Sequence, residues 1–167
     1  MIIAIDGVDR TGKTTLSHEF SKYGYRILSA ELFRLKGHAP IGMRQWADVP
    51  ILSMLQLFDS NAVLDRSLIS VLAYNIDSTK PGNSQDIFLS LMDYVPWYKQ
   101  SVHFVYYTYN DVNTILNRDD DHSKSEIEED NECFQKVYEI CGISPLKIYS
   151  ENSIYENVEK ILSDVKI

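Results

Sequence analysis

The chain has 167 residues, of which 44% are hydrophobic and 24% are charged, a composition typical of one globular domain that spans residues 1–167. Its formal net charge of -8 disfavours nucleic acid as a partner, because broad nucleic-acid binding relies on a basic surface. No apolar run is long enough to cross a membrane, and no secretory signal precedes the first predicted strand. We therefore expect a cytoplasmic protein whose Cys133 and Cys141 are free thiols.

The first predicted element is a short apolar strand over residues 1–5, rich in β-branched side chains as buried parallel strands are. It leads into residues 7–14, G-V-D-R-T-G-K-T, which fit the phosphate-binding pattern G-x-x-x-x-G-K-S/T, and an amphipathic helix is predicted over 14–23. The glycines let the backbone fold around phosphates with its N–H groups pointing inward. Lys13 can reach the β- and γ-phosphates, and the Thr14 hydroxyl can ligate Mg²⁺. The pattern predicts an ATP site formed by Gly7, Val8, Asp9, Arg10, Thr11, Gly12, Lys13, Thr14 and Thr15.

The rest of the chain alternates predicted strands with predicted helices. We expect the helix over 85–94 to stop at Pro96 and the helix over 111–117 to begin at a capping Asp111. Such alternation gives right-handed βαβ units, so we predict a three-layer α/β fold with a five-stranded parallel sheet, whose ligands bind beyond the carboxyl ends of the strands. The other predicted strands are 25–29, 62–65, 102–107 and 146–149, and the other predicted helices are 51–58, 67–76, 126–140 and 153–165.

An acid and an arginine stand at the end of the third predicted strand. Asp65 occupies the position at which P-loop proteins place a carboxylate that faces Mg²⁺, and Arg66 can bind a phosphate through two of its N–H groups. The alternative is that Asp65 caps the helix that follows and that Arg66 pairs with it. Beside a phosphate-binding loop we favour the metal and phosphate roles.

Four segments, spread over most of the chain, resemble the thymidylate kinase family of P-loop nucleoside monophosphate kinases. Residues 6–15 resemble the family's eukaryotic-type loop, which carries D-R inside. Residues 65–74, D-R-S-L-I-S-V-L-A-Y, are similar to the family's D-R-Y/S-x-x-S-x-x-A-Y/F. Residues 129–137, E-D-N-E-C-F-Q-K-V, are similar to its Y-E-N-x-x-F-Q-x-x-V, and residues 146–158 resemble its last strand and helix.

The resemblance implies a P-loop kinase fold with a small lid at about 118–130. It implies phosphorylation of a deoxynucleoside monophosphate, dTMP or a related or modified pyrimidine nucleotide, with ATP as donor and Mg²⁺ as cofactor. Arg10 would act as a built-in arginine finger, Thr14 and Asp65 would hold the metal, and Arg118 would approach ATP. The Tyr74 ring would line the acceptor pocket and disfavour a ribose 2′-hydroxyl. The implied catalytic residues are Asp9, Arg10, Lys13 and Asp65, and the implied acceptor residues include Asp9, Arg66, Ser70 and Tyr74.

The chain departs from the family pattern before Asp65, where it is about one helix shorter. The family's L-F-x-A-N-R is reduced to residues 57–62, which leaves Phe58 as the candidate ring that stacks on the base. Its F-P-x-R-x-T-x-I-G is matched only in part, which leaves Arg34 or Lys36 to grip the acceptor phosphate. A shortened kinase of this lineage is compatible with a viral source and action in a host cytoplasm. The sequence leaves open whether two copies form a homodimer.

Other classes of protein remain as alternatives. A deoxynucleoside kinase must deprotonate a 5′-hydroxyl, and Glu31, just after the second predicted strand, is a candidate base for that step. A kinase that acts on a modified base in DNA is disfavoured by the acidic net charge. A non-catalytic nucleotide-binding module is disfavoured because Arg10, Lys13, Thr14 and Asp65 occur together.

Overall fold

The computed structural model describes residues 1–29, 61–80, 83–117 and 123–165. Within these ranges no helix combines the length and the apolar character that a membrane span needs. Cys133 and Cys141 are both free, as predicted. The predicted helix over 51–58 and several residues singled out in the sequence lie outside the described residues, namely Glu31, Arg34, Lys36, Phe58 and Arg118.

The sheet confirms the predicted fold class. Its five strands run in the order β2-β3-β1-β4-β5, and every neighbouring pair is parallel. β1 and β3 are buried along their whole length. Strands that are covered on both faces have continuous apolar runs of this kind. Ile5 pairs with Asp65, so the carboxyl ends of β1 and β3 lie side by side. The strands are β1 (Ile2–Asp6), β2 (Arg26–Ser29), β3 (Ala62–Asp65), β4 (His103–Thr108) and β5 (Leu146–Tyr149).

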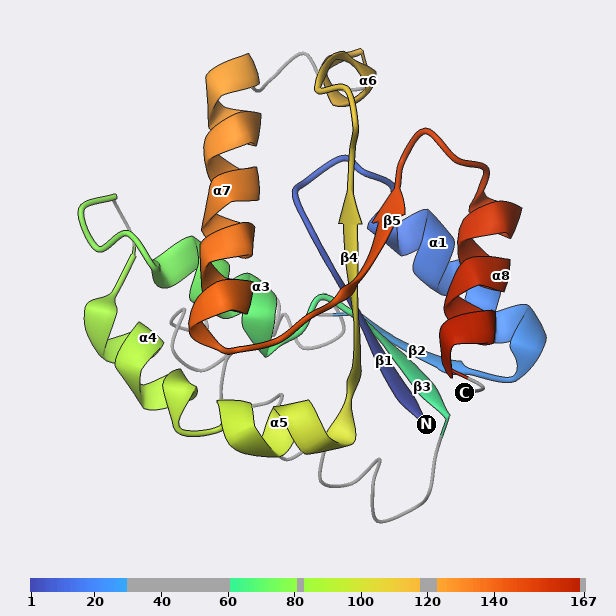
Figure 1. The fold of residues 1–167 in the computed structure, drawn as a ribbon, viewed down its shortest axis with the longest axis horizontal. Coiled ribbons are helices and arrows are strands. Elements are labelled where there is room, and N and C mark those ends of the chain that lie inside the picture. Colours follow the sequence, from blue (N-terminus) through green and yellow to red (C-terminus); the bar gives the residue numbers. More distant parts are fainter. Residues whose placement is uncertain (30–60, 81–82, 118–122, 166–167) are drawn as a thin grey trace, which may run out of the picture.

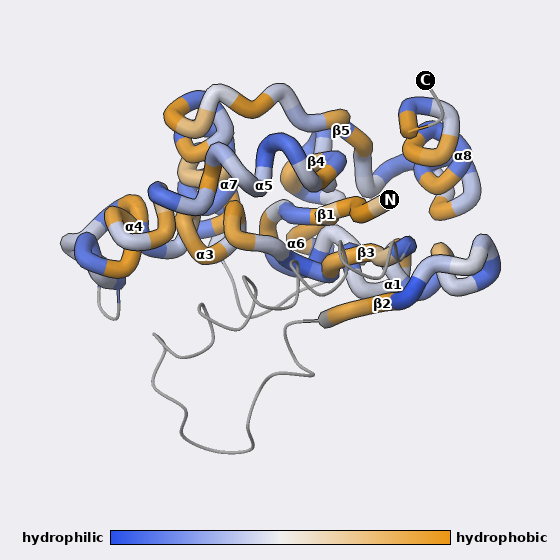
Figure 2. Tube along the Cα trace, turned by 90° about the horizontal axis from the view of Figure 1, so that it is seen from below, coloured by the Kyte–Doolittle hydropathy of each residue, from blue (hydrophilic) through white to orange (hydrophobic). Residues whose placement is uncertain are grey.

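Helices cover both faces of this sheet (Figure 1). One face carries α3 (Leu68–Asn75), α4 (Gln85–Met92), α5 (Val95–Ser101) and α7 (Lys124–Ile140). The other face carries α1 (Lys13–Glu19), the short 3₁₀ helix η1 (Phe20–Tyr23) and α8 (Ile154–Val165), while α6 (Asn113–Leu116) follows β4. Each face has its own apolar cluster, centred on large buried side chains such as Phe134 on one and Phe20 on the other. Figure 2 shows that much of β1, β2 and β3 is hydrophobic along the trace between these layers.

Some of the predicted helix boundaries are wrong, and one helix, α5, is missing from the prediction. Pro96 does not simply stop a helix: it lies in the first turn of α5, where the missing N–H of proline leaves no hydrogen bond unmade. α6 begins after Val112 rather than at Asp111, although the Asp111 carboxylate still accepts a hydrogen bond from the N–H of Asn113 at 3.0 Å.

Capping boxes set the starts of the last two long helices. α7 begins at Lys124, two residues before the predicted 126, because Ser123 and Glu126 exchange hydrogen bonds between side chain and backbone. Ser153 and Glu156 form a second such box at the start of α8, with N–H to oxygen distances of 2.9 and 3.2 Å.

A buried carboxylate joins the end of β1 to the turn after β3. Asp6 is fully buried, and its Oδ1 accepts hydrogen bonds from the N–H of Ser67 at 2.8 Å and from the hydroxyl of Ser70 at 2.6 Å. Its Oδ2 accepts from the hydroxyl of Ser67 at 2.6 Å. Burial raises the pKa of Asp6 although these donors favour its charged form. The carboxylate therefore ties two neighbouring strand ends together inside the protein.

We expect Asp6→Ala to lower the free energy of unfolding by about 3 kcal/mol, because it leaves three donors without their acceptor inside the protein. Urea denaturation would measure this change. The matched control is Asp77→Ala, which removes two hydrogen bonds from Thr79 in an exposed turn and should cost about 1 kcal/mol or less. Equal losses in the two variants would contradict the bracing role of Asp6.

Candidate phosphate-binding site

The loop between β1 and α1 has the backbone that its glycines predict. Gly7 has φ +149°, and a Cβ there would overlap the carbonyl oxygen of Tyr107 on β4, so only glycine fits. Gly12 has φ +96° and stands directly before α1. Inside the loop the Thr11 hydroxyl is buried and donates to the carbonyl oxygen of Val8 at 3.1 Å. The loop is thus closely packed against the sheet and held from within.

This loop and the end of β3 enclose a cleft of about 320 Å³. It lies beyond the carboxyl ends of the central strands, where the fold was predicted to bind ligands. Three of its side chains are cationic, and one, Asp9, is acidic, so an anionic ligand is the natural occupant. All six lining residues belong to the set predicted from the sequence: Asp9, Arg10, Gly12, Lys13, Thr14 and Arg66.

Lys13 is the most buried of these cations. It is only 5% exposed, donates a hydrogen bond to the carbonyl oxygen of Val8, and has its Nζ 3.9 Å from the Asp9 carboxylate. Burial, together with the positive charge of Arg66, lowers the pKa of Lys13 to about 8, although the carboxylates of Asp9 and Asp65 oppose the shift. Below pH 8 the cleft therefore holds a poorly solvated ammonium group that gains from meeting a phosphate.

Thr14 and Asp65, the two predicted metal ligands, are in direct contact. The Thr14 hydroxyl donates to Asp65 Oδ2 at 2.7 Å, and Asp65 is 6% exposed at the end of β3. A hydroxyl and a carboxylate are the oxygen donors that Mg²⁺ prefers. Among the described residues no cluster of three or more His, Cys, Asp or Glu could hold a metal ion.

The alternative roles of Asp65 and Arg66 as a helix cap and its ion-pair partner are wrong. Ser67 is the N-cap of α3, and its hydroxyl accepts a hydrogen bond from the N–H of Ile69 at 3.1 Å. Arg66 pairs instead with Asp9, across the cleft from its own strand. Asp65 is thereby available to Thr14.

Two arginines of the cleft have left-handed backbones. Arg10 has φ 66° and Arg66 has φ 75°. This region is uncommon for residues other than glycine and tends to occur at functional sites. The N–H of Arg66 donates to the carbonyl oxygen of Ile5 at 3.1 Å, which fixes the turn in place. The backbone therefore holds both side chains at the cleft at some conformational cost.

The remaining predicted residues differ in where they lie. Ser70, predicted to bind the acceptor, is 3% exposed and gives its hydroxyl proton to Asp6, so here it braces α3 against β1. Tyr74 is half-buried and accepts a hydrogen bond from Arg66 at 3.2 Å. Thr15 is exposed on α1. Asp6 was not among the predicted site residues, and its one signal in the sequence is an acid at the end of an otherwise apolar strand.

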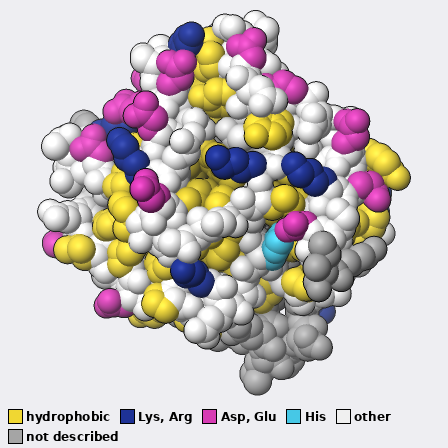
Figure 3. All heavy atoms as spheres, viewed as in Figure 1, with side chains coloured by type: hydrophobic (Ala, Val, Ile, Leu, Met, Phe, Trp, Pro, Cys, Tyr) yellow, Lys and Arg dark blue, Asp and Glu magenta, His cyan; other side chains and the backbone are white. Residues whose placement is uncertain are grey.

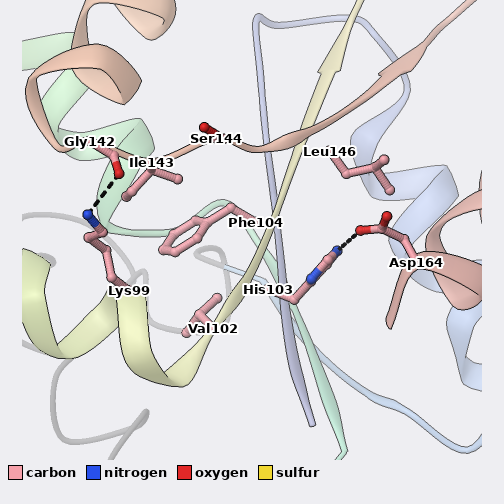
Figure 4. Close-up of a pocket in the computed structure, with 9 residues that line it drawn as sticks. All are labelled: Lys99, Val102, His103, Phe104, Gly142, Ile143, Ser144, Leu146 and Asp164. Atoms are coloured by element: carbon pink, nitrogen blue, oxygen red, sulfur yellow. Dashed lines mark hydrogen bonds and ion pairs between the residues drawn. The ribbon is translucent and has the colours of Figure 1, made fainter. Parts of the chain in front are cut away.

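A second hollow, of about 250 Å³, lies near the start of β4 and β5 (Figure 4). Its two basic side chains already face groups of the protein: Lys99 donates to the carbonyl oxygen of Gly142 at 2.8 Å, and His103 Nε2 lies 3.1 Å from Asp164 Oδ2. On the face that Figure 3 shows, Lys and Arg side chains are scattered among acidic ones and form no basic patch. The loop cleft, where three cations meet, is the better anion site.

Comparison with known proteins finds likeness in structure but not in sequence: no family model and no curated protein matches the chain. The YorR protein of Bacillus subtilis, solved in complex with phosphorylated GDP, has a TM-score of 0.69 at 21% identity and covers 99% of this chain and 96% of its own. Thymidylate kinase from Candida albicans has a TM-score of 0.65 at 14% identity, covering 99% of this chain and 90% of its own. Deoxyadenosine kinase from M. mycoides, bound to dATP, has a TM-score of 0.61 at 18% identity over 100% of both chains. These likenesses establish that the chain has the P-loop kinase fold.

Proposed function

We propose that this protein transfers the γ-phosphoryl group of ATP to a deoxynucleoside monophosphate, with dTMP or a related pyrimidine nucleotide as acceptor. The observation that carries the proposal is the cleft itself, in which Arg10, Lys13 and Arg66 surround one space beside the Thr14–Asp65 pair. Phosphoryl transfer needs little covalent chemistry from a protein, which contributes positioning and positive charge. The structures similar in fold, by their names, act on or bind nucleotides, which agrees with this activity.

On the donor side, the backbone of the loop and Lys13 would hold the ATP phosphates. Thr14 and Asp65 would hold Mg²⁺, which neutralises charge on the β- and γ-phosphates in reactions of this type. Arg10, with its left-handed backbone at the cleft, would stabilise the charge on the group in transfer.

On the acceptor side, Arg66 and Asp9 would meet the incoming nucleotide. A phosphate acceptor is already a nucleophile and needs no general base, and neither described histidine, His18 or His103, lines the cleft. Tyr74 would lie beside the acceptor sugar. The deoxynucleoside kinase alternative depends on Glu31, so an acceptor panel has to decide between the two activities.

The test is ATP consumption against nucleosides, deoxynucleoside and ribonucleoside monophosphates, and oligonucleotides. We expect a pyrimidine deoxynucleoside monophosphate to be the best acceptor and Lys13→Ala to abolish its turnover. Lys99→Ala is the matched control, because Lys99 also donates to a backbone carbonyl but lies at the other hollow, and it should retain wild-type turnover.

Two results would contradict the proposal. Faster turnover of unphosphorylated nucleosides, abolished by Glu31→Gln, would assign the chain as a nucleoside kinase. Wild-type turnover in Lys13→Ala would show that this loop does not bind the donor.

We expect Arg10→Ala to lower kcat by about 10³-fold with a smaller change in nucleotide affinity, since an arginine that stabilises the transition state has an effect of that size. Steady-state kinetics with ATP and the best acceptor would measure both. Arg26→Ala, which removes an exposed arginine at the start of β2, should leave kcat unchanged. A weaker affinity at unchanged kcat would mean that Arg10 binds only the ground state.

We expect ATP binding to take up a proton above pH 8. In the protein without ATP, Lys13 has a pKa of about 8. A bound polyphosphate favours the charged form of Lys13, so ATP binding raises this pKa. Affinity should therefore fall as pH rises through 8. Calorimetry at pH 9 in two buffers of different ionisation enthalpy would measure the uptake. Lys13→Arg keeps the charge without titrating in this range and should show no uptake at pH 9.

A further inference from the structure

The guanidinium of Arg66 is held from two sides by groups of different chemistry. Its Nη2 pairs with the Asp9 carboxylate. Its Nη1 donates to the Tyr74 hydroxyl at 3.2 Å, and its Cζ lies 5.7 Å from the centre of the Tyr74 ring. Two of the five N–H donors of Arg66 are thus used within the described residues, and its side chain is 32% exposed at the cleft.

We propose that the Tyr74 hydroxyl is a positioning group that orients the Arg66 guanidinium toward the acceptor phosphate, a role separate from the contact of the Tyr74 ring with the acceptor sugar. The proposal rests on the proposed function, because it assigns Arg66 to the acceptor phosphate. It divides one side chain into two parts with different tasks. The hydroxyl would affect phosphate binding, and the ring would affect the choice between deoxyribose and ribose.

Both ends of this contact are fixed by the fold. The Tyr74 ring packs edge-to-face on Phe134 of α7, with ring centres 5.8 Å apart and an interplanar angle of 82°, and Phe134 is fully buried. At the other end, the backbone N–H of Arg66 donates to the carbonyl oxygen of Ile5. The backbone N–H of the next residue, Ser67, donates to the Asp6 carboxylate. What remains free to move is the long side chain of Arg66, and the Tyr74 hydroxyl restrains it.

A hydroxyl is suited to this task because it can orient a cation without cancelling its charge. Burial raises the pKa of Tyr74 to about 12, against the opposing effect of Arg66, so the hydroxyl stays neutral near pH 7. Asp9, by contrast, is 43% exposed and anionic, and it competes with a phosphate for the same guanidinium. A phosphate that displaces Asp9 would still find Arg66 held by Tyr74.

The distinguishing variant is Tyr74→Phe, which removes the hydroxyl and keeps the ring. We expect the KM of the acceptor to rise about tenfold, as expected for loss of a hydrogen bond to a charged group. The kcat and the KM of ATP should stay within about twofold of wild type, since Arg66 binds the acceptor phosphate before and during transfer. The preference for deoxy over ribo acceptors should also stay within about twofold, because the ring remains.

Tyr25→Phe is the matched control. Tyr25 is also a half-buried tyrosine in edge-to-face contact with a phenylalanine, with ring centres 5.6 Å apart at 81°, but it lies just before β2 and does not line the cleft. It should change none of these constants. An unchanged acceptor KM in Tyr74→Phe, or an equal rise in both variants, would overturn the proposal.

A second measurement does not depend on activity. In ¹⁵N-arginine-labelled protein the Nη1 and Nη2 resonances of Arg66 should be separate in wild type and should merge in Tyr74→Phe, because the exposed pair with Asp9 alone does not stop rotation of the guanidinium. Arg66→Lys assigns the signals. Resonances that stay separate in Tyr74→Phe would show that Asp9 alone holds Arg66 and would overturn the proposal. If no monophosphate is phosphorylated by wild type, the proposed function fails, while this measurement still decides whether Tyr74 orients Arg66.

Discussion

The site depends on the buried Asp6 carboxylate. β1 and β3 are far apart in the sequence, and each carries half of the cleft: the loop with Lys13 follows one, and Arg66 follows the other. Asp6 binds the backbone and hydroxyl of Ser67 from the end of β1, so the turn after β3 cannot shift without breaking buried hydrogen bonds. Hydrogen bonds to a buried carboxylate whose donors are all present hold those donors in fixed positions. The separation of the two halves is therefore set inside the protein, below the cleft.

Above this brace, a chain of charged and polar groups joins the two sides of the cleft. Lys13 lies 3.9 Å from Asp9, Asp9 pairs with Arg66, and Arg66 donates to Tyr74. Asp9 is the shared member, and it offsets positive charge on both sides. A phosphate that binds Arg66 would weaken the ion pair between Arg66 and Asp9 and leave the Asp9 carboxylate to interact with Lys13. Asp9 is thus an exposed link between the two sides of the cleft, in addition to the hydrogen bonds of Thr14 with Asp65 and of Ser67 with Asp6.

Local patterns in the sequence predicted most of the fold, because each strand and most helices have their own signal. Short apolar runs between helical segments marked the five strands, and the spacing of glycines, Lys13 and Thr14 marked the loop. The contact between Thr14 and Asp65 could be anticipated, since both follow parallel strands at the same sheet edge. The bonds of Asp6 with Ser67 and Ser70, and of Arg66 with Tyr74, could not, because they depend on how distant segments pack. α5 was missed because a proline is typical both of the residues that follow a helix and of the first turn of a new one, and the prediction gave Pro96 only the former role.

The left-handed backbones of Arg10 and Arg66 set function against stability. Each costs about 1–2 kcal/mol relative to glycine, which adopts this conformation freely. A redesign that optimised stability alone would select glycine at both positions. It would thereby remove two of the three cations of the cleft, and with them most of the positive charge on which the proposed phosphate binding depends.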